Sequence, residues 1–160
     1  VQRMSAGTGL THSEFNLAAR PVHFYQIWIF PDEAGLKPSY DQKRFAAADW
    51  RNKLLPVASG QGKAGAVTFH TYATIYRCDL ETGNTVAHKP TAGRRIFVYL
   101  TKGLLTANGE TVRSKDQARI DVDEPLTLEA KQDSELILID VPSCKGWGYT
   151  RDTLKGKKSG

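Results

Sequence analysis

The chain has 160 residues, 40% of them hydrophobic, which is enough for one domain with its own core and argues against general disorder. It contains no run of about 18 apolar residues, so no membrane-spanning helix is expected. Most of the net charge of +5 follows Cys144, where five basic residues accompany one acid, Asp152. Because the first 143 residues are almost neutral, direct nucleic-acid binding is not expected. Two cysteines form no disulfide framework, which favours a reducing cytoplasm.

Short runs with period-2 alternation follow one another along the chain and predict an all-β fold, as a closed or sandwiched antiparallel sheet. Turn chemistry separates the runs, most clearly at Asn108-Gly109, where both residues tolerate the positive φ of a tight hairpin turn. One short helix is expected, at Phe45–Asn52. The predicted strands are Gln2–Ala6, Thr11–Asn16, His23–Phe30, Leu54–Ala58, Val67–His70, Ala73–Leu80, Thr85–His88, Arg95–Thr101, Leu104–Ala107, Glu110–Val112, Ala118–Val122, Leu126–Ala130 and Glu135–Val141.

The predicted strand His23–Phe30 is strongly apolar. Phe24, Trp28 and Phe30 share one of its faces, and we expect them in the core. His23 lies on the other face, where a partly buried, hydrogen-bonded histidine is the preferred interpretation over a metal ligand.

His12 and Glu14 form a His-x-Glu pair within the predicted strand Thr11–Asn16. Residues at i and i+2 of a strand share a face, so the imidazole and the carboxylate can aim at one point. Both groups are common metal ligands, but no His-x-His run follows that would complete a set. From the residues alone, a surface polar pair is the preferred interpretation of these two positions.

The remaining candidate residues have simpler interpretations. Neither His70 nor His88 has a His or carboxylate two residues away, so neither forms a ligand pair within its own strand. Cys78 is expected to be buried as a small hydrophobe. Arg94-Arg95 could clamp an anion, but a solvated strand start is preferred.

Three early segments, and more loosely three later ones, resemble the pirin family of the cupin superfamily. The early segments read QRMSAGTGLTHSE, PVHFYQIWIFP and GLKPSYDQKRFA; the later ones are Ala73–Tyr76, Gly93–Arg95 and Leu136–Pro142. The resemblance implies a cupin jelly-roll (double-stranded β-helix) barrel, together with strands left over from a truncated first cupin. Residues 1–30 would be the closing strands of the first, metal-binding cupin, 31–142 the second cupin, and 143–160 a flexible basic tail.

The same resemblance implies a function. His12 would be a metal ligand, and Glu14 both a ligand and the catalytic base of a metal-dependent quercetin 2,3-dioxygenase that opens a flavonol ring. The expected metal is divalent, with iron first and nickel, zinc, copper or manganese as alternatives. Two of the family's His ligands lie upstream of the matching segment, so the expected ligand set is incomplete, and the metal can be absent.

Two alternatives to the enzyme stay open: a non-enzymatic pirin-like binding protein or transcriptional co-regulator, and an inactive fragment. Both alternatives include binding to a protein partner, or to further copies of the chain, through the exposed strand edge. The expected location is the cytoplasm, or the nucleus if the source is eukaryotic.

Overall fold

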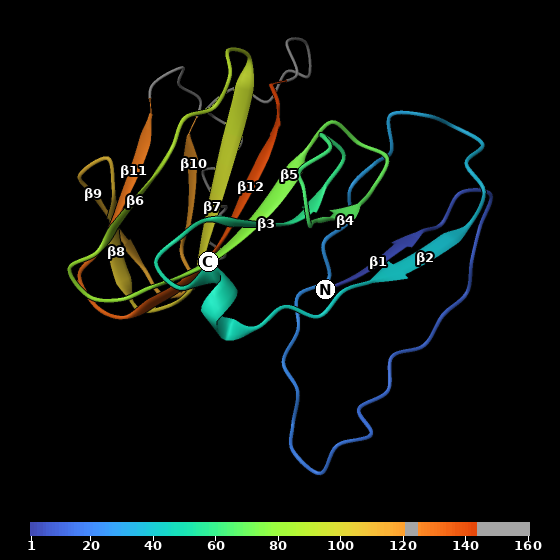
Figure 1. The fold of residues 1–160 in the computed structure, drawn as a ribbon, viewed down its shortest axis with the longest axis horizontal. Coiled ribbons are helices and arrows are strands. Elements are labelled where there is room, and N and C mark those ends of the chain that lie inside the picture. The colour runs from blue at the N-terminus through green and yellow to red at the C-terminus, as the bar shows by residue number, and fades with distance from the viewer. Residues whose placement is uncertain (121–124, 144–160) are drawn as a thin grey trace, which may run out of the picture.

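The computed structural model describes residues 1–120 and 125–143. Nearly all the regular structure in them is β, which confirms the predicted all-β class (Figure 1). Its elements are β1 (Gln2–Ser5), β2 (Ser39–Gln42), the 3₁₀ helix η1 (Ala47–Trp50), β3 (Leu55–Ser59), β4 (Val67–Thr68), β5 (Thr74–Leu80), β6 (Thr85–His88), β7 (Arg94–Lys102), β8 (Leu104–Ala107), β9 (Glu110–Arg113), β10 (Gln117–Ile120), β11 (Leu126–Ala130) and β12 (Ser134–Pro142).

Two sheets facing each other form the body of the protein (Figure 1). The six-stranded sheet has the order β10-β7-β12-β5-β3-β4, and the four-stranded sheet has the order β6-β11-β8-β9. Neighbouring strands pair antiparallel, except for β3 and β4, which are parallel. Long ladders join β12 to β7 on one side and to β5 on the other, so β12 is the central strand of the larger sheet.

The core lies between the two sheets because alternate residues of the long strands point inward. In β5, β7 and β12, buried and half-buried residues alternate without interruption over most of the strand. Burial of one large aliphatic side chain stabilises a fold by roughly 1.5–3 kcal/mol. The fully buried members of the core include Leu80, Ile96, Val98, Leu100, Leu105, Leu126, Leu128, Leu136 and Leu138.

The hairpin between β8 and β9 turns at Asn108-Gly109, as the sequence predicts. Both residues have positive φ, +49° and +86°, which suits Asn followed by Gly. The Asn108 side chain also accepts a hydrogen bond from the Thr127 backbone N–H at 2.7 Å. The turn is thereby joined to β11 as well as to its own strands.

From β3 to β12, the predicted strands are confirmed to within about two residues at each end where the structure describes them. Residues 121 and 122 of the predicted strand Ala118–Val122 fall outside the described residues. The helix prediction at Phe45–Asn52 was too long, since only η1 forms. The helix ends at Trp50 because Arg51 is already extended, and Asn52, with a φ of +54°, donates its backbone N–H to the Asp79 carbonyl at 2.8 Å.

Residues 6–38 form a long loop outside the two sheets, closed at its base by the β1–β2 ribbon (Figure 1). Ser5 pairs with Ser39 across that ribbon, which the sequence had not predicted because β2 is wholly polar apart from Tyr40. Gly7 helps to close the loop, since a Cβ at this position would lie 2.0 Å from the Leu36 carbonyl oxygen. Only a glycine fits so close an approach of two backbones.

Two strand predictions in this loop were wrong. Neither Thr11–Asn16 nor His23–Phe30 pairs with another described strand. The predicted core residues Phe24, Trp28 and Phe30 are 57%, 84% and 91% exposed, and His23 is exposed as well. An alternating apolar pattern predicts that one face of a segment is buried. The segment forms a strand, however, only where the edge of another strand is available to pair with it.

No helix within the described residues is long and apolar enough to cross a membrane. The predicted tail, 143–160, lies outside the described residues apart from Ser143.

Candidate functional site

The loop places His12 and Glu14 side by side. His12 Nε2 lies 4.0 Å from Glu14 Oε1, and the two side chains are 36% and 44% exposed. Gln2 Nε2 also donates to Glu14 Oε1, at 3.4 Å, which ties the pair to the β1–β2 ribbon. The predicted proximity of imidazole and carboxylate is therefore present, although on an exposed loop and not on a strand.

The pair offers the right donor types for a divalent metal but only two of them. Catalytic metal sites generally use three or more protein ligands. Among residues 1–120 and 125–143, no group of three or more His, Cys, Asp or Glu side chains is arranged to hold a metal ion. These residues fit part of a coordination sphere, and their role as ligands stays a prediction.

A buried polar network that the sequence analysis missed lies at one end of the two facing sheets. Arg94 begins β7 and points inward, where its Nε donates to Asp140 Oδ1 at 2.6 Å. His88, at the end of β6, lies with Nε2 2.9 Å from Asp140 Oδ2. The side chains of Arg94 and Asp140 are only 3% and 8% exposed. The expectation of a solvated start to β7 was therefore wrong for Arg94.

The rest of the guanidinium is also hydrogen-bonded. Arg94 Nη1 donates to the Tyr72 carbonyl at 2.9 Å, and Nη2 donates to the backbone carbonyl of Asp140 at 3.0 Å. The guanidinium also lies over the Tyr72 ring, 4.9 Å from its centroid. Since a buried charge is tolerated only when it is paired and hydrogen-bonded, this network explains how β7 can begin with an inward arginine.

Further polar and aromatic side chains surround the Arg94–Asp140 ion pair. Thr74 Oγ1 donates to Gln61 Oε1 at 2.7 Å and lies 2.7 Å from Ser59 Oγ. The Tyr76 ring meets the His88 ring edge-on at a centroid distance of 5.1 Å. Burial, and then the negative charge of Asp140, raise the pKa of the Tyr76 phenol, which therefore stays protonated at neutral pH.

The pKa of Asp140 reflects opposing effects. Burial by itself would raise the pKa of this carboxyl group. The hydrogen bonds from His88 and Arg94 and the guanidinium charge outweigh burial, so the pKa lies below the usual value for an aspartate. Because each carboxylate oxygen already has a partner, this network serves to join the two sheets and leaves no charge available for a ligand.

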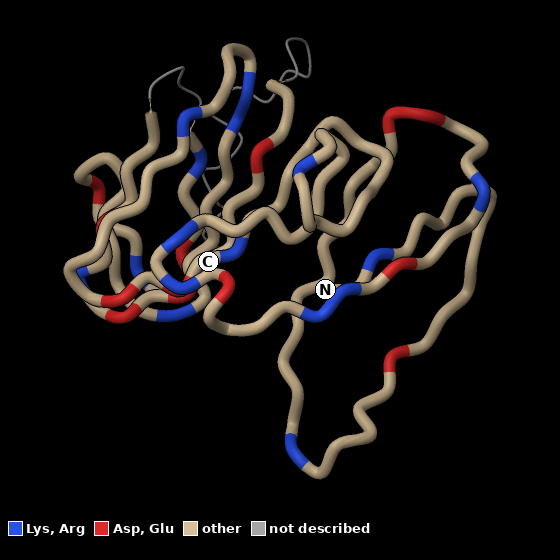
Figure 2. The backbone as a smooth tube through the Cα atoms, in the orientation of Figure 1, with Lys and Arg blue, Asp and Glu red and all other residues tan. Residues whose placement is uncertain are grey.

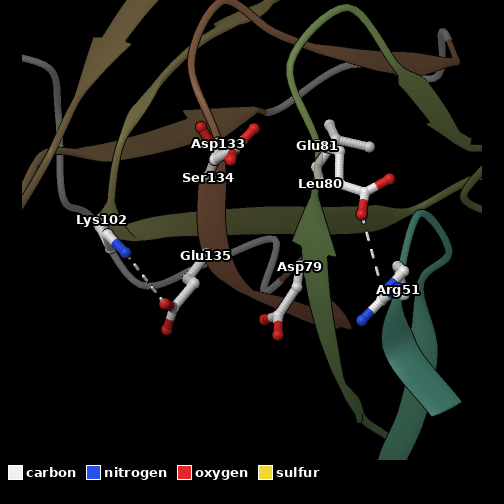
Figure 3. A pocket seen from close by; sticks show the side chains of 8 residues that line it. All are labelled: Arg51, Asp79, Leu80, Glu81, Lys102, Asp133, Ser134 and Glu135. Carbon is white, nitrogen blue, oxygen red and sulfur yellow. Dashed lines mark ion pairs between the residues drawn. The ribbon is translucent and has the colours of Figure 1, made fainter. Parts of the chain in front are cut away.

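A hollow of about 190 Å³ opens at the other end of the larger sheet (Figure 3). Charged side chains of both signs line it, and they pair with each other: Arg51 Nε with Glu81 Oε1 at 3.7 Å, and Lys102 Nζ with Glu135 Oε1 at 3.8 Å. Trp50 Nε1 donates to Asp79 Oδ2 at 2.8 Å at the same place. With Asp79 and Asp133 also in the lining, four acidic side chains face two basic ones, so the hollow has an excess of negative charge.

The strands β5–β12 form two facing sheets around one apolar core, an architecture that the double-sheet jelly rolls of cupins share. Residues 56–141, more than half of the chain, match the family described as the quercetinase C-terminal cupin domain. The chain therefore belongs to the pirin family of cupin proteins, as the sequence resemblance indicated.

The relatives agree with this assignment. The chain is 36% identical over 142 residues to quercetin 2,3-dioxygenase of Escherichia coli K12, a match that covers 88% of this chain and 60% of the relative. The crystal structure of YhhW from Escherichia coli superimposes with a TM-score of 0.68 at 31% identity, covering 73% of this chain and 49% of that one. The bacterial pirin YhhW in complex with nickel(II) gives a TM-score of 0.67 with the same identity and coverage.

The chain spans about 60% of the length of the curated relatives it matches. The matched cupin domain contains His88, Arg94 and Asp140, and it begins after His12 and Glu14. The buried network is thus a feature of the cupin domain itself, and the His-x-Glu pair lies outside it.

Proposed function

We propose that this chain takes part in a metal-dependent oxidation of the quercetin 2,3-dioxygenase type, with His12 and Glu14 as two ligands of a divalent metal. The observation that carries the proposal is the approach of an imidazole and a carboxylate to 4.0 Å, ahead of a quercetinase-type cupin domain. It is supported by relatives named quercetin 2,3-dioxygenase and by a pirin structure that contains nickel(II). Iron is our first choice of metal.

The two proposed ligands have different tasks. His12 would hold the metal through a neutral ring nitrogen. Glu14 would be a ligand and also the base that takes the proton from a flavonol hydroxyl. The metal, when bound, would act as a Lewis acid toward the substrate oxygens. Its remaining ligands would have to come from solvent or from another polypeptide segment, because the described residues supply only this pair.

Metal analysis tests this function directly. The purified chain is equilibrated with Fe²⁺ or Ni²⁺, dialysed, and assayed for metal content and for loss of the quercetin absorbance under O₂. We expect His12→Ala and Glu14→Gln to lower the bound metal, and His70→Ala, which removes an exposed imidazole elsewhere, to leave it unchanged. Metal retained in full by both site variants would contradict the proposal, and metal-free wild-type protein would exclude a site that solvent alone completes.

The second candidate function is a binding role without catalysis, as a pirin-like co-regulator or partner protein. The observation that favours it is the set of large apolar side chains exposed on the 6–38 loop, among them Phe15, Leu17 and Trp28. Large apolar side chains in contact with solvent mark interaction surfaces more often than catalytic ones. A chain without metal or turnover that still associates through this loop would support it, whereas an inactive monomer would favour the inactive fragment.

Two further predictions remain proposals. They are the domain boundaries at residues 30 and 142 and the cytoplasmic location. The first division crosses the β1–β2 ribbon, whose strands lie on either side of residue 30. Limited proteolysis tests it: cleavage confined to the loop, with 31–142 left as a folded product, is the expected result.

A further inference from the structure

Asn108-Gly109, the turn between β8 and β9, is a chemically reactive pair of residues at the surface of the cupin domain. It is the one Asn-Gly pair of the sequence. Both residues are exposed, and β9 is an edge strand of the four-stranded sheet. Asparagine is a thermolabile residue because the backbone nitrogen of the next residue can attack its side-chain amide, and glycine in that place has no side chain to obstruct the attack. The turn is therefore a candidate site of covalent modification.

The modification is deamidation, and its only co-reactant is water. The Gly109 nitrogen loses its proton to hydroxide and forms a bond to Asn108 Cγ. The Cγ–Nδ2 bond breaks, and Nδ2 takes up a proton and leaves as ammonia. The backbone and the side chain are then joined in a succinimide ring. Water opens this ring at either carbonyl group, which leaves aspartate or isoaspartate at position 108.

The folded turn holds the two reacting atoms apart. Ala107 pairs with Glu110, so Asn108 and Gly109 form a two-residue loop, and their φ values of +49° and +86° match a type I′ turn. The first central residue of this turn has a ψ of about +30°, which places the next nitrogen nearly opposite Cβ about the Cα–C bond. Ring closure needs this nitrogen on the same side as Cβ. The Cα–C bond of Asn108 therefore has to rotate through a large angle before the attack.

The neighbouring strand β11 prevents Asn108 from following such a rotation. Thr127 N–H donates to Asn108 Oδ1 at 2.7 Å, and Asn108 N–H donates to the Thr127 carbonyl at 2.9 Å. Because Asn108 is fixed on β11 at two atoms, the rotation has to displace Gly109 and the start of β9. That displacement breaks the pairing of Ala107 with Glu110. Exposure to water is therefore not sufficient for the reaction, since the hairpin must open first.

We propose that Asn108 is a deamidation site gated by the β8–β9 hairpin, which is inert while the hairpin is closed and reacts when β9 separates from β8. Two hydrogen bonds of ordinary net strength favour the closed form by roughly 10- to 100-fold. Hairpins open and close within microseconds, far faster than an amide deamidates. The rate of modification therefore follows the fraction of molecules in which the hairpin is open.

The two products differ in whether the hairpin can close again. Aspartate at position 108 keeps the length of the backbone, and its carboxylate can accept the Thr127 N–H. Glu110 is the only acidic residue from 103 to 113, so this new charge has one acidic neighbour within the hairpin (Figure 2). Isoaspartate carries the chain through its Cβ and lengthens the backbone by one carbon. Since the turn fixes the register, a lengthened turn cannot keep Ala107 opposite Glu110. Isoaspartate thus makes a transient opening permanent.

Peptide-mapping mass spectrometry after incubation at mildly alkaline pH measures this reaction. Folded wild type is compared with the protein in guanidinium chloride, and a synthetic peptide of residues 104–113 gives the intrinsic rate with and without the denaturant. We expect deamidation of Asn108 to be slower in the folded protein by roughly 10- to 100-fold. Asn84 is the internal control, because the β-branched Thr85 after it hinders the attack in both states. Equal rates at Asn108 in both states, or no reaction in the unfolded protein, overturn the proposal.

Two valine substitutions separate opening of the hairpin from unfolding of the whole domain. Val112 lies in β9 and Val86 in β6, the opposite edge strand of the same sheet, and they are 5% and 9% exposed. Val112→Ala should raise the deamidation rate of Asn108 in the folded protein more than Val86→Ala does, because only Val112 packs β9 onto the core. Thermal melts fix a temperature at which both variants are folded. Equal rates in the two variants overturn the gate at the hairpin.

Refolding tests the fate of the two products. Protein deamidated in denaturant is refolded and treated briefly with protease, and position 108 is analysed in the resistant fraction. We expect aspartate to be retained in that fraction and isoaspartate to be depleted from it. Asn108→Asp is the control and should be as resistant as wild type. Isoaspartate in the resistant fraction in the same proportion as aspartate contradicts the permanent opening.

This inference is independent of the proposed metal chemistry. The hairpin lies within the matched cupin domain, residues 56–141, whereas His12 and Glu14 lie outside it. Failure of metal binding leaves the deamidation test unchanged, and a protein that deamidates equally fast in both states leaves the proposed metal ligands standing.

Discussion

His88 and Asp140 join the two sheets of the cupin domain through a buried polar contact. His88 Nε2, at the end of β6, lies 2.9 Å from Asp140 Oδ2 on β12, and Arg94 occupies the other carboxylate oxygen. The three residues come from three strands and both sheets. At this end of the domain, the polar contacts of His88 and Arg94 therefore both depend on the Asp140 carboxylate.

Removal of that carboxylate should strongly destabilise the fold. Asp140→Ala leaves the Arg94 guanidinium buried without its counter-charge, and loss of one partner of a buried pair typically costs about 3–5 kcal/mol. Urea denaturation measures the free energy of unfolding. The control is Glu129→Ala, which breaks a surface pair with Lys131 and should cost less than about 1 kcal/mol. Equal losses in the two variants would contradict a special role for Asp140.

The stabilisation from Asp140 should disappear in acid. The folded state lowers the pKa of this carboxyl group, so its contribution is complete above the usual aspartate pKa of about 3.9 and is lost as the pH falls through the folded-state pKa. Urea midpoints of wild type and Asp140→Asn should differ by a constant amount from pH 5 to 7 and converge below about pH 4. A difference that stays constant at pH 3, or increases there, would exclude this linkage.

Cys78 should be unreactive in the folded protein. Burial, and then the nearby charge of Asp79, raise the pKa of its thiol to about 12, and the side chain is fully buried. At neutral pH the thiolate, which is the reactive form, is therefore almost absent. In a Cys144→Ser background, iodoacetamide should modify Cys78 only when denaturant is added. Rapid labelling under native conditions would mean that β5 opens locally far more often than its central position implies.

Gly103 should tolerate no side chain. It connects β7 to β8 with a φ of +96°, and a Cβ there would lie 2.4 Å from the Asp133 carbonyl oxygen. Gly103→Ala should lower the free energy of unfolding by about 1–3 kcal/mol or more. Gly109→Ala is the matched control, because Gly109 also has a positive φ, +86°, but open space around its Cα. A loss no greater than that of the control would show that the neighbouring backbone moves aside.

Much of the cupin domain could be predicted from the sequence because its strands bury one face and alternate strictly. The long strands β5, β7 and β12 follow this pattern, and the Asn108-Gly109 turn was predicted on chemical grounds alone. The strand β2 was missed because four polar or exposed residues carry no alternation. The strand predictions in the 6–38 loop failed for the opposite reason, since alternation was present but a partner edge was not.

The buried network was missed because charged residue types were assigned to the surface. Their positions in the alternation of inward and outward side chains were given less weight. Arg94 is in phase with the buried Ile96, and Asp140 is in phase with the buried Leu138, so alternation by itself placed both charges inside. Their sequence separation of 46 residues concealed the pairing. By contrast, the proximity of His12 and Glu14 was predicted from their i, i+2 spacing on a strand, and it is present although that strand does not form.

The β1–β2 ribbon brings the two ends of the 6–38 loop together. The chain leaves at Ser5 and returns at Ser39, and these two residues are direct neighbours. A short turn between them would therefore complete the ribbon without re-threading any strand of the cupin domain. Exchanging the loop between relatives would transfer the His-x-Glu pair with it, but would also require the bonds of Phe30 and Asp32 to residues 70–72 to be rebuilt.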